Sequence, residues 1–263
     1  VSNLRWLQVF TGFFLLIAVV IILGRLSPGF GSLMSRISQP GAHAGGVFWI
    51  WMLVIPFSQA LINKKLPILA RVALMVFSGL VLYVGVRLSY DWKSGYVPPL
   101  AGVAFIIALL LRRRIIWFIP VAVVVAIYIG INSISSEDYS WLTRLEAWKI
   151  VLQLATVSPV FGLGFGNYYF NTLNIPINGW YVNFNSHSQY VDMLAQTGLL
   201  GFAIFCWVCW VIGRLGWRLR DRAPEGFARA YVYGALGGLV GMLVAGGLVD
   251  WVLPFVYNIG LDG

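Results

Sequence analysis

Arg144 and His187 are the side chains whose types and spacing could support group transfer on an anionic substrate. Arginine presents a planar fork of N–H donors that matches phosphate oxygens, and a neutral imidazole can accept a proton from a hydroxyl near physiological pH. Between them the chain carries alternating glycines and an amide, namely Gly162, Gly164, Gly166 and Asn167. A cation, a pliable turn and a titratable ring in one stretch indicate chemistry on a negatively charged substrate.

The residues that follow His187 predict how its imidazole is held. They form a long apolar run, and the spacing from His187 to Gly198 is about three helical turns at 3.6 residues per turn. We therefore expect both residues on one helix face, with Gly201 about one turn further and the two glycines in helix packing. A lone histidine is often only a hydrogen-bonding residue, so a structural role stays open. Asp192, on the same run, either orients the site or pairs with a cation.

Residues 141–157 predict the element that holds Arg144. Apolar residues recur there at helical spacing, in the series Leu142, Leu145, Trp148, Val151 or Leu152, and Ala155, which indicates an amphipathic helix. Its tryptophans suit the headgroup level, so the helix should lie along the outer interface and hold Arg144 at the depth of a lipid phosphate. The alternative is that Arg144 anchors the helix to headgroups or pairs with a nearby acid, Glu146 or Asp138.

Residues 160–185 could shape the site around these two side chains. Alternate glycines in 160–167 let the backbone adopt conformations closed to other residues and approach another group closely. The spacing is neither a dinucleotide-binding fingerprint nor a P-loop, and a packed turn is the alternative. Residues 167–185 are rich in aromatic rings and amides, including Tyr168 and Trp180, which suits either a sugar or a membrane interface.

Composition defines the class of protein that must position these residues. The chain is 60% hydrophobic and 10% charged, which excludes a soluble domain of this length. No alternating pattern of a membrane barrel is present, so we expect an all-α, polytopic transmembrane bundle in one domain, 1–263. Glycines in the last apolar run predict close helix packing. The expected spans, seven in number, are 5–24, 46–62, 66–87, 98–111, 115–131, 188–213 and 227–249.

The charge distribution predicts the orientation of these spans. Lys and Arg concentrate in short cytoplasmic loops, and most of the basic residues fall on one side if the seven runs alternate. The net charge of +9 is therefore a topology signal, and nucleic acid is not an expected partner. With this orientation the large exterior loop is 132–187, and it carries the candidate site.

The motifs together resemble a known family. Arg144-x-x-x-Trp148, then Pro159-x-x-Gly-x-Gly-x-Gly-Asn, then His187-Ser followed by nine residues and Gly198-x-x-Gly, resembles the signature of the O-antigen ligase and polymerase superfamily. The His-Ser, spacer and GxxG element is its most specific part. Family members have more spans than this chain, so we expect a C-terminal portion of a longer protein.

The resemblance implies a function. It implies a GT-C-like membrane glycosyltransferase of the bacterial inner membrane, with its active face on the periplasmic side. The donor is a glycan on undecaprenyl diphosphate, the acceptor is a hydroxyl of a lipid or glycan, and no metal or other cofactor takes part. By position, Arg144 matches the family's diphosphate-binding loop arginine, and His187 matches the histidine that activates the acceptor in an inverting displacement.

A second diphosphate-binding cation is also implied by the resemblance. The family often carries Ser-Arg at the outer end of an earlier span, and here that stretch contains Arg87 and Lys93 instead. Either could serve.

Two other functions stay open at the level of the sequence. A polymerase of the same superfamily would use the same donor and a glycan acceptor. A polysaccharide or lipid transporter would also explain charges and glycines within the membrane, although the polar residues gather in one exterior loop rather than at the midplane.

Overall fold

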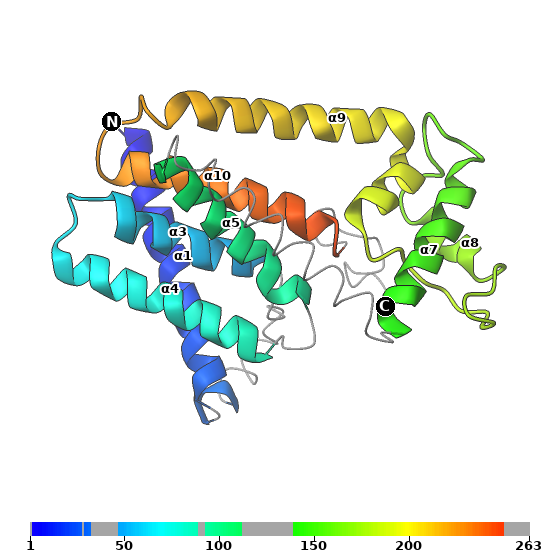
Figure 1. Ribbon diagram of the computed structural model, residues 1–263, viewed down its shortest axis with the longest axis horizontal. Coiled ribbons are helices and arrows are strands. Elements are labelled where there is room, and N and C mark those ends of the chain that lie inside the picture. The colour runs from blue at the N-terminus through cyan, green and yellow to red at the C-terminus, as the bar shows by residue number, and fades with distance from the viewer. Residues whose placement is uncertain (1, 28, 33–46, 89–92, 112–138, 250–263) are drawn as a thin grey trace. The chain divides into compact units, whose positions relative to one another are not determined.

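The computed structural model describes residues 2–27, 29–32, 47–88, 93–111 and 139–249. Every regular element among these residues is an α-helix, which confirms the predicted all-α class (Figure 1). The helices are α1 (Ser2–Leu26), α3 (Val47–Ile62), α4 (Ile68–Leu88), α5 (Lys93–Leu111), α7 (Tyr139–Ala155), α8 (Asn167–Thr172), α9 (Gln189–Leu219) and α10 (Phe227–Gly246).

The predicted spans correspond to these helices to different degrees. Four helices of the described residues are long and apolar enough to cross a membrane: Asn3–Leu26, Ile68–Arg87, Gln189–Leu219 and Phe227–Gly246. Two further predicted spans are shorter apolar helices, Val47–Ile62 and Gly95–Leu111. The predicted span 115–131 lies outside the described residues.

The chain divides into two compact units. The first comprises Val1–Ile107 and Val211–Ala245, and the second comprises Ala108–Trp210 and Gly246–Gly263. The candidate site residues Arg144 and His187 belong to the second unit, whereas Arg87 and Lys93 belong to the first.

The first unit is a packed helical bundle. Helix α3 lies against both α1 and α4, and its buried side chains include Trp49 and Met52. Helices α5 and α10 approach each other backbone to backbone, because a Cβ added at Gly102 would lie 2.6 Å from Gly237 O. A Cβ at Gly237 would in turn lie 2.8 Å from Gly102 O. This contact confirms the close packing predicted from the glycines of the last apolar run.

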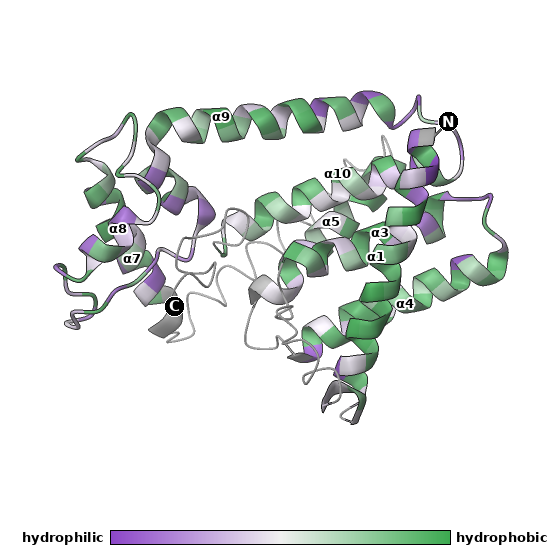
Figure 2. Cartoon of the chain, turned by 180° about the vertical axis from the view of Figure 1, so that it is seen from behind, coloured by the Kyte–Doolittle hydropathy of each residue, from purple (hydrophilic) through white to green (hydrophobic). Residues whose placement is uncertain are grey.

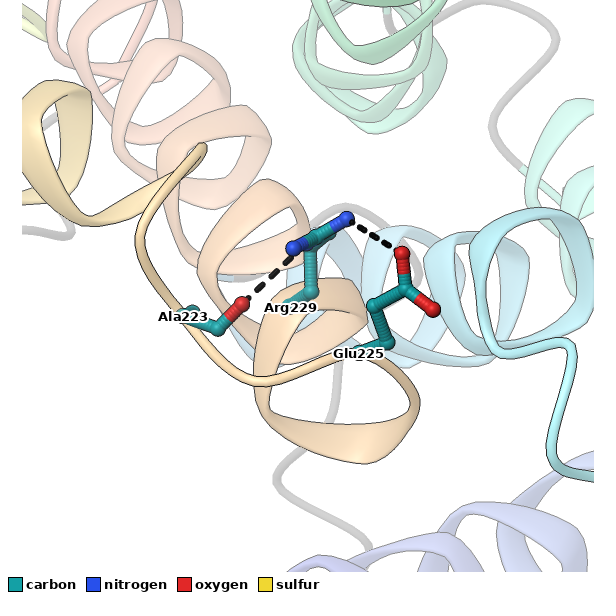
Figure 3. A network of polar contacts seen from close by, with 3 residues as sticks. All are labelled: Ala223, Glu225 and Arg229. Carbon is teal, nitrogen blue, oxygen red and sulfur yellow. Dashed lines mark hydrogen bonds and ion pairs between the residues drawn. The ribbon is translucent and has the colours of Figure 1, made fainter.

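The turn between α9 and α10 is closed by Arg229 (Figure 3). Its Nε donates to Ala223 O at 3.2 Å, and its Nη1 lies 3.2 Å from Glu225 Oε1. Glu225 is 77% exposed, so the ion pair adds little, about 0–1 kcal/mol. Gln59 on α3 donates to Phe227 O at 3.2 Å and ties the start of α10 to the bundle.

The second unit contains α7, α8 and the first part of α9. Helix α7 confirms the helix predicted over 141–157. Its apolar series is divided between two environments: Leu142 is 63% exposed and Leu145 is 43% exposed, whereas Val151 is fully buried against Tyr168 and Val191, with Trp148 and Ala155 packed on the same cluster.

Candidate functional site

The glycine segment and α9 meet at a break in the helix. Gly198 has φ 64° and ψ −168°, which no helical residue adopts, so α9 consists of two helical parts on either side of it. Breaking a helix leaves carbonyl groups without partners before the break and N–H groups without partners after it. The backbone of residues 159–164 supplies the missing partners on both sides.

Four backbone hydrogen bonds connect residues 159–164 to the two parts of α9. Leu163 N and Gly164 N donate to Ala195 O and Gln196 O, at 2.8 and 3.0 Å, and satisfy the end of the first part. Pro159 O and Val160 O accept from Leu199 N and Leu200 N, at 2.9 and 3.1 Å, and satisfy the start of the second. The Gln196 side chain adds a bond, because its Oε1 accepts from Gly166 N at 3.1 Å. Residues 159–166 therefore hold α9 on both sides of its break, and we call this segment the clasp.

The clasp requires glycine at two facing positions. Both Gly162 (φ 76°) and Gly198 have positive φ, a region that costs other residues about 1–2 kcal/mol. A Cβ at Gly162 would lie within 3.0 Å of the Gln196 backbone, and one at Gly198 would lie within 3.0 Å of the Val160 backbone. Close backbone approach, rather than flexibility, explains these two glycines.

The structure corrects the predicted geometry of His187 and the glycines after it. Helix α9 begins at Gln189, so His187 precedes the helix and shares no helix face with Gly198. Gly198 packs against the 159–164 backbone rather than a neighbouring helix, and a Cβ at Gly201 would meet the side chain of Thr197, the residue just before the break. The prediction failed because a continuous apolar run does not reveal a break whose partners lie far upstream.

His187 is held in a left-handed conformation at the entrance to α9. Its φ is 50°, and its side chain is exposed. The residues on either side are buried, Ser186 at 0% exposure and Ser188 at 2%. A left-handed residue other than glycine persists where its surroundings fix it. The imidazole is therefore presented to the outside by two anchored neighbours.

Ser186 is anchored from three directions. Its carbonyl oxygen accepts from Trp148 Nε1 at 2.7 Å, which links the turn to α7. Its N–H donates to the Tyr168 hydroxyl at 3.3 Å, and its own hydroxyl donates to Asp192 Oδ1. Tyr168 also donates to Asp192 Oδ1.

Asp192, Ser186 and Tyr168 thus form a polar cluster with no exposed surface. A buried carboxylate is costly unless hydrogen bonds compensate it, and here two hydroxyls converge on one carboxylate oxygen. Asp192 was predicted from the sequence either to orient the site or to pair with a cation. Ser186 was not predicted, and Tyr168 was expected among the loop aromatics that suit a sugar or a membrane interface. A serine next to a histidine gives no signal of its own, and the burial of Tyr168 depends on tertiary packing.

Arg144 lies on α7 and reaches the segment that follows α10. Its Nη1 donates to Leu248 O at 3.0 Å. The next carbonyl, Val249 O, accepts from Gln189 N at 3.2 Å, and Gly246 O accepts from the Ser188 hydroxyl at 3.4 Å. Residues 246–249 therefore connect Arg144 with the turn that carries His187.

The remaining predicted residues lie in less constrained positions. Glu146, an alternative partner of Arg144, accepts from Asn178 N at 3.2 Å, and Asp138 lies outside the described residues. Asn167 is exposed at the start of α8, and its Nδ2 donates to Leu163 O at 2.7 Å. Trp180 is 68% exposed, in a turn closed by reciprocal backbone bonds with Ile177. Arg87 lies at the end of α4 and Lys93 at the start of α5.

The apolar helices and this polar site define an α-helical integral membrane protein with a surface site at one end of a candidate span. Residues 93–206 match the family model described as O-antigen ligase, and the match includes Arg144, the glycine segment and His187. This match confirms the resemblance seen in the motifs. A search of curated proteins found no match to the chain.

Proposed function

We propose that the protein transfers a glycan from undecaprenyl diphosphate to a hydroxyl acceptor at the periplasmic face of the bacterial inner membrane. The O-antigen ligase match over 93–206 is the observation that supports this class of reaction. The connection of Arg144 and the His187 turn through consecutive backbone carbonyls supports a shared site. The reaction is an inverting displacement that needs no metal ion.

Arg144 binds the diphosphate of the donor in this proposal. When the glycan departs, negative charge builds on the phosphate oxygens, and a guanidinium can meet two of them at once. The bond from Arg144 to Leu248 O holds the guanidinium beside the start of α9. The donor's anionic group is thereby brought next to the turn that presents the imidazole.

His187 acts as the general base. Neutral imidazole accepts the proton of the acceptor hydroxyl as the oxygen attacks the anomeric carbon, and the bond from that carbon to the diphosphate breaks. Because the imidazole is exposed, an acceptor can reach it directly. The buried cluster of Ser186, Tyr168 and Asp192 fixes the backbone on which the base stands.

Two further features belong to the proposal. The family resemblance implies a second cation for the diphosphate, and Arg87 and Lys93 are its candidates in the sequence. Exposed rings of the 167–185 segment, Trp180 above all, offer an apolar face to a sugar ring.

Reconstitution with a glycan-loaded undecaprenyl diphosphate tests the proposal. The protein, its His187→Ala variant and a control, His43→Ala, which removes the other histidine of the sequence, are incubated with donor and a lipid acceptor. The products are resolved on a gel. A single shift of the acceptor indicates a ligase, and a ladder built on the donor indicates a polymerase. Absence of transfer with every acceptor, or equal activity in His187→Ala, would contradict the proposal, and movement of intact donor across the bilayer would favour a transporter.

A further inference from the structure

The clasp and the turn just before it carry exposed apolar side chains. Val157 is 76% exposed, Val160 50%, Phe161 72% and Phe165 67%. We call these four residues the clasp tip. They lie in a segment whose backbone is tightly held, so their exposure is a feature of the fold and not of a loose loop.

The glycines separate an inner from an outer side of the clasp. Leu163, between Gly162 and Gly164, packs on the buried cluster around Val151 and Tyr168. Phe161 and Phe165, two residues away on either side, are left outside. Contiguous exposed apolar patches on proteins mark interaction sites with partners or membranes. The clasp tip therefore needs an apolar partner.

Helix α9 indicates what that partner is. From Leu199 to Leu219 the helix is uninterrupted, and these 21 residues span about 31 Å at 1.5 Å per residue. The hydrocarbon core of a bilayer is about 30 Å thick. Large apolar side chains along this part are exposed, among them Ile204 at 52% and Trp207 at 65%, and most of the helix is coloured as hydrophobic in Figure 2.

Because the 199–219 part of α9 is about as long as the hydrocarbon core is thick, one boundary of that core falls at Gly198. The other end of the helix carries Arg214 and Arg218, as expected for the cytoplasmic side. The clasp is bonded to Leu199 N and Leu200 N, the first residues of the spanning part. Its exposed phenylalanines and valines therefore stand at the level where acyl chains meet headgroups.

We propose that the clasp tip inserts into the outer leaflet of the membrane and binds a lipid surface. The inference does not rest on the proposed enzymatic function. Insertion also fixes the height of the candidate site, because the first part of α9, from Gln189 to Thr197, rises at most about 14 Å above the break. His187 is thus kept within reach of groups that lie at headgroup depth.

Spin labelling of the full chain in vesicles tests this inference. Cys206→Ser and Cys209→Ser remove both cysteines of the sequence, and single cysteines are then introduced as Val157→Cys, Phe161→Cys or Phe165→Cys. After nitroxide labelling and reconstitution into phosphatidylethanolamine–phosphatidylglycerol vesicles, accessibility to oxygen and to a water-soluble nickel chelate is measured. Oxygen concentrates in the acyl region, whereas the chelate stays in water.

Two positions of the same unit serve as references. Ile204→Cys lies on the spanning part of α9 and represents lipid, and Asn183→Cys, at an exposed polar residue, represents water. We expect the oxygen-to-chelate ratio at the clasp tip to exceed that at Asn183 severalfold and to approach that at Ile204. Three separate labels keep the test valid if one variant fails to fold.

Two results would overturn the inference. A ratio equal to that at Asn183 would mean that the tip faces water. Exclusion of both reagents, with an immobile nitroxide, would mean that protein covers it, either another segment or a second copy.

Discussion

Arg144 and Gln189 donate hydrogen bonds to consecutive carbonyl groups, Leu248 O at 3.0 Å and Val249 O at 3.2 Å. Consecutive Cα atoms are 3.80 Å apart, so the two donors meet at one short stretch of backbone. Gln189 is the first residue of α9, two positions after His187. Arg144 and the start of α9, which follows His187, are thus joined through the same two residues, Leu248 and Val249.

Replacing Arg144 by lysine tests whether the guanidinium fork, and not only its charge, is needed. Lysine keeps the charge but loses the bidentate geometry. We expect kcat/KM for glycan transfer to fall on the order of 10²-fold, the size seen when one transition-state donor is removed. Lys149→Gln, at an exposed position of the same helix, is the control and should leave transfer unchanged. Wild-type turnover by Arg144→Lys would contradict a bidentate role.

Two substitutions at His187 separate the imidazole from the backbone that carries it. Both His187→Ala and His187→Gly remove the base, so both should abolish transfer and retain donor binding. Glycine tolerates the observed φ of 50°, whereas alanine does not, so His187→Gly should be the more stable by about 1 kcal/mol. Donor binding and thermal unfolding are measured in parallel. Lower stability of the glycine variant would argue against a left-handed residue at this position.

Much of this architecture could be predicted from the sequence. Hydropathy predicted the helical class and the approximate bounds of α1, α4 and α10, because lipid exposure requires long apolar runs. The order of Arg144, the glycines and His187 predicted the family. Arginine and histidine are residue types that the proposed reaction needs, and glycine is the type that close contact between backbones needs.

Three-dimensional detail could not be predicted from the same patterns. The break at Gly198 depends on hydrogen bonds from residues 159–164, and apolar periodicity continues through it. The cluster around Asp192 depends on burial, which brings Tyr168 and Ser186 to one carboxylate oxygen. Neither leaves a local signal, since the break at Gly198 and the bond from Tyr168 to Asp192 each depend on residues that are distant along the chain.

The Asp192 cluster should position His187 without touching substrate. Asp192→Ala leaves the buried Tyr168 hydroxyl without its acceptor, which costs about 1–3 kcal/mol, whereas the Ser186 hydroxyl keeps Ser188 O as an acceptor at 2.9 Å. Tyr168→Phe removes only one of the two donors and should cost less. In both variants kcat should fall while KM for the donor stays near the wild-type value. A rise in KM with kcat unchanged would indicate a role in binding.

Alanine at Gly162 tests the clasp, with Gly179 as a matched control. Both residues have positive φ, 76° and 83°, so both variants incur the left-handed penalty of about 1–2 kcal/mol. Gly179 has open space where a Cβ would stand, whereas the Cβ at Gly162 would collide with the Gln196 backbone. Gly162→Ala should therefore lower the apparent Tm clearly further than Gly179→Ala. Because the collision displaces the helix part that carries Asp192, it should also reduce transfer, while Gly179→Ala should not. Equal Tm values would mean that the backbone contact between the clasp and α9 contributes little to stability.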